Sequence, residues 1–139
     1  MNFLLVSVNY RNTNLTENLL SSISKFDVAR SIRVGIVDNA STIKSRKLLA
    51  DIKYKNSLKI DILFNNKNNF YWPAAKQMIN NLLKKYGDYP DWIMICNNDM
   101  IFNNENFFSS LKEINPEKYP IIGPHIVNQS GRALNPFLK

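Results

Sequence analysis

The ten residues from Ile32 to Ser41, which read IRVGIVDNAS, contain the pattern that decides the fold. Their first part, Ile32–Val37, is mostly apolar and β-branched, as expected of a strand that is buried inside a sheet. The polar residues DNAS follow at once and end this strand in a turn. In open parallel sheets, ligands bind just beyond the carboxyl ends of such strands. The stretch therefore predicts both a buried strand and a candidate ligand site.

The same pattern occurs on both sides of this stretch. Apolar runs predict further buried strands, and a last β-prone segment that contains Gly123 and Pro124 is expected at an edge of the sheet. These strands are expected over Asn2–Val8, Lys59–Phe64 and Trp92–Cys96 and, at the edge, over Tyr119–Val127. Apolar residues at helical spacing predict helices between the strands. The helices are expected to begin at Asn14, to span Ser45–Ile52, to run from Pro73 to Gly87, and to span Asn104–Ile114.

Strands and helices that alternate along a chain predict an α/β fold, with a mostly parallel sheet and helices on both of its faces. The 139 residues contain no linker or repeat, so a single domain is expected over residues 1–139. The chain has neither a GxGxxG segment nor a Walker lysine loop, which disfavours a standard dinucleotide site or P-loop. Its apolar runs are too short to cross a bilayer, and its N-terminus lacks the basic start of a signal peptide.

Composition narrows the classes of site and partner. The only cysteine is Cys96 and the only histidine is His125, which excludes an internal disulfide framework and any two-histidine metal motif. Lys and Arg number 18 against 11 acidic residues, and the net charge of +7 favours anionic partners such as phosphate-bearing ligands, nucleic acid or an anionic membrane surface. The basic residues are spread out rather than clustered, so nucleic acid is not expected as a partner. The many asparagines, four of them within residues 65–69, reflect genome composition as much as chemistry.

Three polar clusters, at residues 7–10, 38–41 and 97–99, follow predicted strands and should meet at one edge of the sheet. Asp38 fits a hydrogen-bond acceptor for a nucleobase or a ribose, and it equally fits a turn residue that caps the next helix. Asp99 fits a ligand for Mg²⁺ or Mn²⁺, which prefer oxygen ligands and often bind through one carboxylate together with substrate phosphates. Asn97 would support such a cation, and the alternative for Asp99 is again a plain turn residue.

These clusters resemble the nucleotide-sugar half of family-two glycosyltransferases with the GT-A fold. The resemblance rests on VSVNY at residues 6–10, VDNAS at 37–41 and NNDM at 97–100, which occur in the family's order and on the matching elements. The rhamnosyltransferase-like bacterial group is the most similar, and the segment Ile122–Pro124 resembles a later segment of the family. The resemblance extends over nearly the whole chain.

The resemblance implies a role for each matching position. The first cluster would clamp the nucleobase, the second would bond the base and line the nucleotide pocket, and the third would occupy the ends of the D-x-D element. Asp99 would bind a Mg²⁺ or Mn²⁺ cofactor that bridges the donor diphosphate and stabilises the leaving nucleoside diphosphate. The positions expected to bind the donor on this basis are Ser7, Asn9, Tyr10, Asp38, Asn39 and Asn97.

The chain departs from the family pattern at two places within the site. The family loop before the third helix carries a glycine, where this chain has Phe70 or Tyr71, depending on register. A large side chain there would narrow or reshape the donor pocket. Lys76, on the helix that follows, fits a partner for a donor phosphate, although a solvated helix lysine is the simpler interpretation. Asn97 replaces the first aspartate of the D-x-D element, which removes one charge from the metal site.

The resemblance implies a cytoplasmic, inverting, metal-dependent glycosyltransferase with peripheral association to the inner face of the cell membrane. It would transfer sugar from a nucleotide-diphosphate sugar to a polysaccharide or lipid-linked acceptor. The family's catalytic base lies beyond residue 139, so the chain is expected to be a fragment or a natural truncation. The alternatives are a catalytically incomplete donor-binding module and another α/β nucleotide-binding domain, such as a nucleotidyltransferase.

Overall fold

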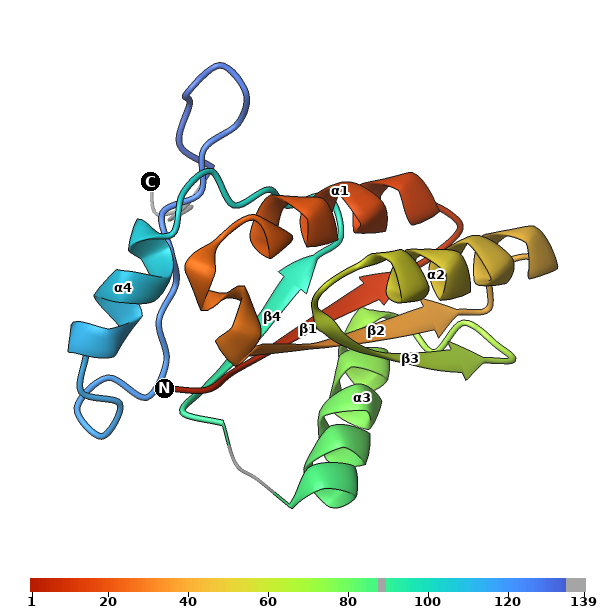
Figure 1. Cartoon of the computed structure of the whole chain (residues 1–139), viewed down its shortest axis with the longest axis horizontal. Coiled ribbons are helices and arrows are strands. Elements are labelled where there is room, and N and C mark those ends of the chain that lie inside the picture. The colour runs from red at the N-terminus through yellow and green to blue at the C-terminus, as the bar shows by residue number, and fades with distance from the viewer. Residues whose placement is uncertain (88–89, 135–139) are drawn as a thin grey trace.

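The computed structural model describes residues 1–87 and 90–134, and four parallel strands form its sheet (Figure 1). The strand order is β3-β2-β1-β4, with β2 and β1 in the centre and β3 and β4 at the edges. All three neighbouring pairs are parallel, so each strand is connected to the next by a crossover. The carboxyl ends of all four strands therefore lie at the same edge of the sheet. This arrangement confirms the predicted α/β fold. The strands are β1 (Phe3–Asn9), β2 (Ile32–Asn39), β3 (Lys59–Asn65) and β4 (Trp92–Asn97).

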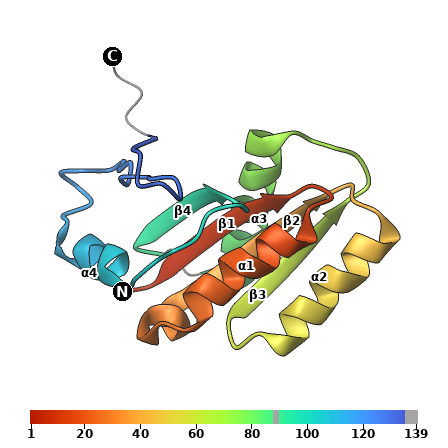
Figure 2. The same ribbon diagram turned by 90° about the horizontal axis from the view of Figure 1, so that it is seen from above.

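Helices cover both faces of the sheet, as Figures 1 and 2 show. One face packs against α1 (Thr13–Ser24), the short 3₁₀ helix η1 (Asp27–Ser31), α2 (Ile43–Lys55) and α4 (Asn106–Glu113). The opposite face packs against α3 (Tyr71–Tyr86). No helix among the described residues is long and apolar enough to cross a membrane.

The two cores are built from alternate residues of the central strands. On β1 every residue is buried, with Phe3 and Leu5 in the larger core under α1 and α2, and Leu4 and Val6 in the smaller core under α3. Such burial on both faces is why this strand reads as a continuous apolar run rather than an alternating one. The rigid centre of the sheet fixes the ends of β1 and β2, where the polar clusters begin.

The structure corrects two of the predicted strands. The β4 strand pairs with β1 on one side only, and its residues Ile93 and Ile95 are 41% and 38% exposed. It is therefore a half-buried edge strand rather than a fully buried one. Residues 119–127 form no strand of the sheet. Their only ladder contact is an isolated antiparallel bridge between Val127 and Ala133.

The start of α3 also differs from the prediction. The helix begins at Tyr71, two residues before Pro73, and Phe70 stands at the N-cap position. Proline is tolerated there because the backbone N–H groups of the first helical turn have no partner within the helix. Gly87 adopts the left-handed conformation and ends α3, as predicted.

Gly35 on β2 sets how closely α3 approaches the sheet, since a Cβ atom there would lie 2.6 Å from Met78 Cγ and 2.8 Å from Leu82 Cδ1. Gly35→Ala is therefore expected to lower the free energy of unfolding by about 1–2 kcal/mol through overpacking. Urea unfolding followed by circular dichroism measures the change. Gly123→Ala is the matched control, because a Cβ at Gly123 meets nothing within 4 Å. Equal stability of the two variants would mean that α3 moves away at no cost.

Candidate functional site

Buried polar side chains gather at the carboxyl edge of the sheet. Asn9, Asp38, Asn39 and Asn65 stand at the ends of β1, β2 and β3, and all are at most 6% exposed. The register pairs Asn9 with Asp38 and Asn39 with Asn65 across neighbouring strands. Buried polar groups cost free energy unless they are hydrogen-bonded, so the partners of these side chains decide what the edge can do.

Asp38 is the centre of the first network. Its Oδ1 accepts a hydrogen bond from Asn9 Nδ2 (3.0 Å), and its Oδ2 accepts from the backbone N–H of Ser41 (3.2 Å) and from Arg46 Nε (3.1 Å). The carboxylate thus closes the turn after β2, whereas the N-cap of α2 is Thr42, which accepts from the N–H of Ser45. A carboxylate offers about four acceptor positions, and these bonds use three of them. Because Asp38 is 0% exposed, neighbouring side chains cover the fourth position.

Asn98 ties the turn after β4 to the rest of the edge. Its Nδ2 donates to Thr16 Oγ1 on α1 (3.1 Å), to the carbonyl of Asn12 (3.3 Å) and, at 3.5 Å, to Asn9 Oδ1. Asn9 Oδ1 also accepts from Thr16 Oγ1 at 3.0 Å. Because the middle residue of this turn is held inward, its two neighbours, Asn97 and Asp99, are left exposed.

Asp99 lies near Tyr71, the first residue of α3, as its electrostatic effect on that residue indicates. Its carboxylate makes no hydrogen bond or ion pair with any residue that the structure describes. The pKa of the half-buried Tyr71 is raised to about 12, chiefly by burial and to a smaller extent by electrostatic interaction with Cys96 and Asp99. Tyr71 therefore keeps its proton at neutral pH, and it lies close enough to Asp99 to interact electrostatically with its carboxylate. Burial and Asp99 likewise raise the pKa of Cys96 to about 12, which excludes a thiolate nucleophile at this position.

Asn39 is the centre of the second network and holds the loop between β3 and α3. Its Nδ2 donates to Asn68 Oδ1 (2.6 Å) and to the carbonyl of Phe70 (3.2 Å). Its Oδ1 accepts from the backbone N–H of Asn69 (2.9 Å) and from Asn65 Nδ2 (3.4 Å). The side chains of Asn65 and Asn68 thus have a structural function in this hydrogen-bonded loop.

Backbone strain is concentrated at the same edge. Among the described residues, three non-glycine residues have positive φ: Arg11 (63°), Ala40 (64°) and Phe70 (59°). They lie in the connections that follow β1, β2 and β3, respectively. Such conformations cost on the order of 1–3 kcal/mol each and are found preferentially at binding and catalytic sites. This concentration marks the edge as a candidate site independently of any family resemblance.

The remaining predicted residues lie at different depths. Ser7 is fully buried, and its hydroxyl has no hydrogen-bond partner among the described residues. Tyr10 is 42% exposed at the rim of the edge, where the Arg11 guanidinium lies over its ring at 4.8 Å. Lys76 is exposed on the second turn of α3 and makes no hydrogen bond or ion pair with the described residues. The structure therefore brings Asp38, Asn9 and the turn at Asn97 together, while Lys76 stands apart.

Sequence reasoning missed the side chains that hold these networks. Arg46 reaches from α2 to Asp38 and also donates to the backbone carbonyl of Asn65. Thr16 on α1 and Asn98 link β1 to β4. The signal available for Arg46 was its position in the first turn of the helix that follows the DNAS turn.

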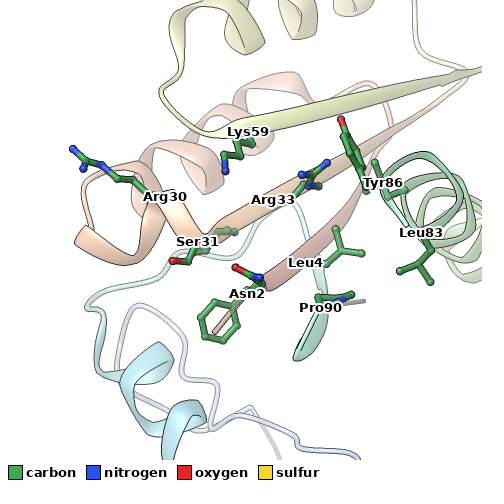
Figure 3. Close-up of a pocket in the computed structure, with 12 residues that line it drawn as sticks. Asn2, Leu4, Arg30, Ser31, Arg33, Lys59, Leu83, Tyr86 and Pro90 are labelled. Carbon is green, nitrogen blue, oxygen red and sulfur yellow. The ribbon is translucent and has the colours of Figure 1, made fainter. Parts of the chain in front are cut away.

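A hollow of about 200 Å³ lies at the opposite edge of the sheet, at the amino ends of the strands (Figure 3). Arg30, Arg33 and Lys59 contribute its positive charge, and the guanidinium of Arg33 lies 3.2 Å from the centre of the Tyr86 ring. None of the residues predicted to bind a ligand lines this hollow. The carboxyl edge is therefore the candidate site.

The donor set at this edge suits a hard cation that is shared with a ligand. The described residues contain no group of three or more His, Cys, Asp or Glu side chains that could hold a metal ion. Asp99 supplies one exposed carboxylate and Asn97 an exposed amide beside it. Mg²⁺ and Mn²⁺ accept such oxygen ligands, but they need further oxygens, for example from phosphates, to complete six-fold coordination. The residues fit a cation of this class only together with a phosphate-bearing ligand.

Comparison with protein-family models and with curated proteins found no match. Among solved structures, S. aureus TarS 1-349 in complex with UDP is similar with a TM-score of 0.65 and 18% identity, over 81% of this chain and 31% of that chain. The mannosyltransferase PcManGT from Pyrobaculum calidifontis, in complex with GDP-Man and Mn²⁺, is similar with a TM-score of 0.63 and 17% identity. That match covers 78% of this chain and 30% of that chain.

A third similar structure is S. aureus TarS 1-349 in complex with UDP-GlcNAc, with a TM-score of 0.58 and 21% identity. Identities this low indicate a shared fold. The structural similarity is to GT-A glycosyltransferases in general, and it does not support the predicted similarity to the rhamnosyltransferase group. This chain spans about a third of the length of the chains in these three structures. It therefore has the fold of the corresponding part of GT-A glycosyltransferases.

Proposed function

We propose that this chain binds the nucleotide-sugar donor of an inverting glycosyltransferase that depends on Mg²⁺ or Mn²⁺. One observation carries the proposal: the exposed carboxylate of Asp99 lies near enough to the first turn of α3 to raise the pKa of Tyr71, and that turn contains no acidic residue. A diphosphate between them would meet a cation on Asp99 and the partly positive N-terminus of a 16-residue helix. The GT-A fold and the buried networks at the same edge support it.

The networks assign different roles to the donor-binding residues. Asp38 would accept a hydrogen bond from the nucleobase with its remaining acceptor position, which neighbouring side chains must first uncover because Asp38 is 0% exposed. Tyr10 would stack on the base from the rim. Ser7 and Asn9 are fully buried, so they would act beneath the ligand, Asn9 by holding Asp38. Asn39 would shape the pocket through the loop that it holds, and Lys76 stays a proposed phosphate contact. A bound cation would neutralise the charge that develops on the leaving diphosphate.

The acceptor and the location of the enzyme are part of the same proposal. A glycan or lipid-linked acceptor fits sugar transfer by GT-A proteins, and the net charge of +7 fits a peripheral protein at the anionic cytoplasmic face of a membrane. Glu105, Glu113 and Glu117 lie on or beside α4, away from the strand ends, so none of them is proposed as the base that activates the acceptor. A donor-binding module without turnover is the second candidate, because the chain spans about a third of its structural relatives.

Asp99→Asn is expected to remove most of the coupling between metal and nucleotide. In the wild type, saturating Mn²⁺ should raise the affinity for UDP or GDP by about 5- to 150-fold, the usual range for coupled ligands. The amide of the variant is nearly isosteric but lacks the charge that attracts the cation. Calorimetric titration of each nucleotide with and without Mn²⁺ measures this coupling.

The matched control for this titration is Asp51→Asn, which removes one exposed carboxylate from α2. It should keep the full dependence on Mn²⁺. If the wild type binds nucleotide equally well without metal, or if Asp99→Asn keeps the whole coupling, Asp99 is not the cation ligand. Absence of any nucleotide binding by the wild type would refute the proposed function as a whole.

A further inference from the structure

Phe70 adopts a backbone conformation that is almost restricted to glycine. Its φ is 59° and its ψ is 178°, and it stands directly before the first residue of α3. Any residue with a Cβ atom is strained in this region of conformational space. The resemblance expects a glycine at the position of either Phe70 or Tyr71. Of these two residues, Phe70 is the one with the strained backbone.

The contacts that hold this conformation do not involve the aromatic ring. The N–H of Phe70 donates to Asn68 Oδ1 (2.9 Å), and its carbonyl accepts from Asn39 Nδ2 (3.2 Å). Both bonds go to backbone atoms and would form equally well with glycine. The side chain is 75% exposed, so packing does not account for it either. Neither the loop nor the core explains why the residue is phenylalanine.

The position of Phe70 relative to Asp38 suggests an explanation. Asn9 on β1 pairs with Asp38 on β2. Tyr10 directly follows Asn9 in the chain, and Asn39 directly follows Asp38. Asn39 in turn holds the Phe70 carbonyl. Two exposed aromatic residues, one from the connection after β1 and one from the loop before α3, thus lie beside the strand end that carries Asp38.

We propose that Phe70 provides a second aromatic surface for the nucleobase, so that the base stacks between Phe70 and Tyr10 while Asp38 bonds its edge. This inference rests on the proposed function. Stacking of a base on an aromatic side chain tolerates any base because every base has a π-face. Glycine would adopt this backbone conformation without strain but has no ring on which the base could stack. The stacking role would therefore explain why a strained phenylalanine is present at this position.

The test compares two ligands and two properties. Phe70→Gly and Phe70→Ala should each weaken binding of UDP or GDP, in the presence of Mn²⁺, by about tenfold. Binding of pyrophosphate with Mn²⁺, which has no base, should not change. Phe70→Gly should also raise the melting temperature because it releases strain, so that affinity and stability move in opposite directions. Phe70→Tyr should keep the wild-type affinity.

Tyr54→Ala is the control, since Tyr54 is an aromatic residue that is 87% exposed in the last turn of α2, outside the proposed site. It should leave nucleotide affinity unchanged. If the wild type binds UDP or GDP and both Phe70→Gly and Phe70→Ala bind it equally tightly, the stacking role is wrong while the proposed function stands. An equal loss of pyrophosphate binding would show instead that Phe70 acts on the loop and not on the base. If the wild type binds neither nucleotide, the proposed function and the stacking role fail together.

Discussion

Replacing Asp38 by alanine is expected to lower the free energy of unfolding by about 3 kcal/mol. The carboxylate is fully buried and accepts hydrogen bonds from Asn9, from the backbone of Ser41 and from Arg46. Removing one partner of a buried charge pair costs about 3–5 kcal/mol because the other charge and its donors are left without a partner. The lower end applies here, since the side chain of Arg46 is 30% exposed and can be hydrated.

Urea unfolding of Asp38→Ala, Asp38→Asn and the control Asp51→Ala measures this effect. Asp38→Asn keeps the shape but not the charge, so its loss of stability should lie between those of the other two. The folded fraction of Asp38→Asn should also bind UDP or GDP more weakly. An amide forms weaker hydrogen bonds with Ser41 and Arg46 than a carboxylate does, and it replaces one acceptor oxygen by an NH₂ donor. A loss below about 1 kcal/mol for Asp38→Ala would show that Arg46 and Asn9 find new partners.

Phe108→Ala is expected to lower the free energy of unfolding by about 3–5 kcal/mol, the usual cost of truncating a buried phenylalanine. Phe108 is 1% exposed and meets Phe3 edge to face, with ring centroids 5.5 Å apart. Its ring also stacks on Phe102 at 5.3 Å. Phe108 and Leu111 are the buried residues of α4, and a helix of eight residues has little stability of its own. The variant should therefore also lose the helical signal of α4.

The control for this substitution is Phe107→Ala, at a neighbouring ring that is only partly buried. Its loss of stability should be less than half of that for Phe108→Ala. Thermal unfolding followed by circular dichroism gives both values. Equal losses would mean that the aromatic cluster shares its packing energy evenly and that Phe108 is not the anchor of α4.

The central strands could be predicted from the sequence because both of their faces are buried. Every residue from Phe3 to Asn9 is buried, so the apolar run alone identifies the strand. The run Trp92–Cys96 looks the same in the sequence, yet Ile93 and Ile95 are exposed. Apolar residues on an open face carry no sign of their exposure, and this is why the edge position of β4 was not predicted.

The location of the candidate site could also be predicted, because parallel strands bring their carboxyl ends to one edge. The residues that hold the site could not, since Arg46, Thr16 and Asn98 reach it from other elements of the fold. The register of the loop before α3 was open between Phe70 and Tyr71. The positive φ of Phe70 favours this residue as the one in the glycine position. A backbone angle of a single loop residue cannot be derived from the pattern of side chains in the sequence.

The outer side of β4 has a consequence for the behaviour of the chain in solution. Its backbone groups have no ladder partner among the described residues, and Ile93 and Ile95 lie on its uncovered face. Such a strand is a template on which a second molecule can add its own. Repulsion between copies that each carry +7 opposes this self-association, and about 0.1 M salt screens charges beyond roughly 10 Å. Raising the ionic strength should therefore favour self-association of the isolated chain.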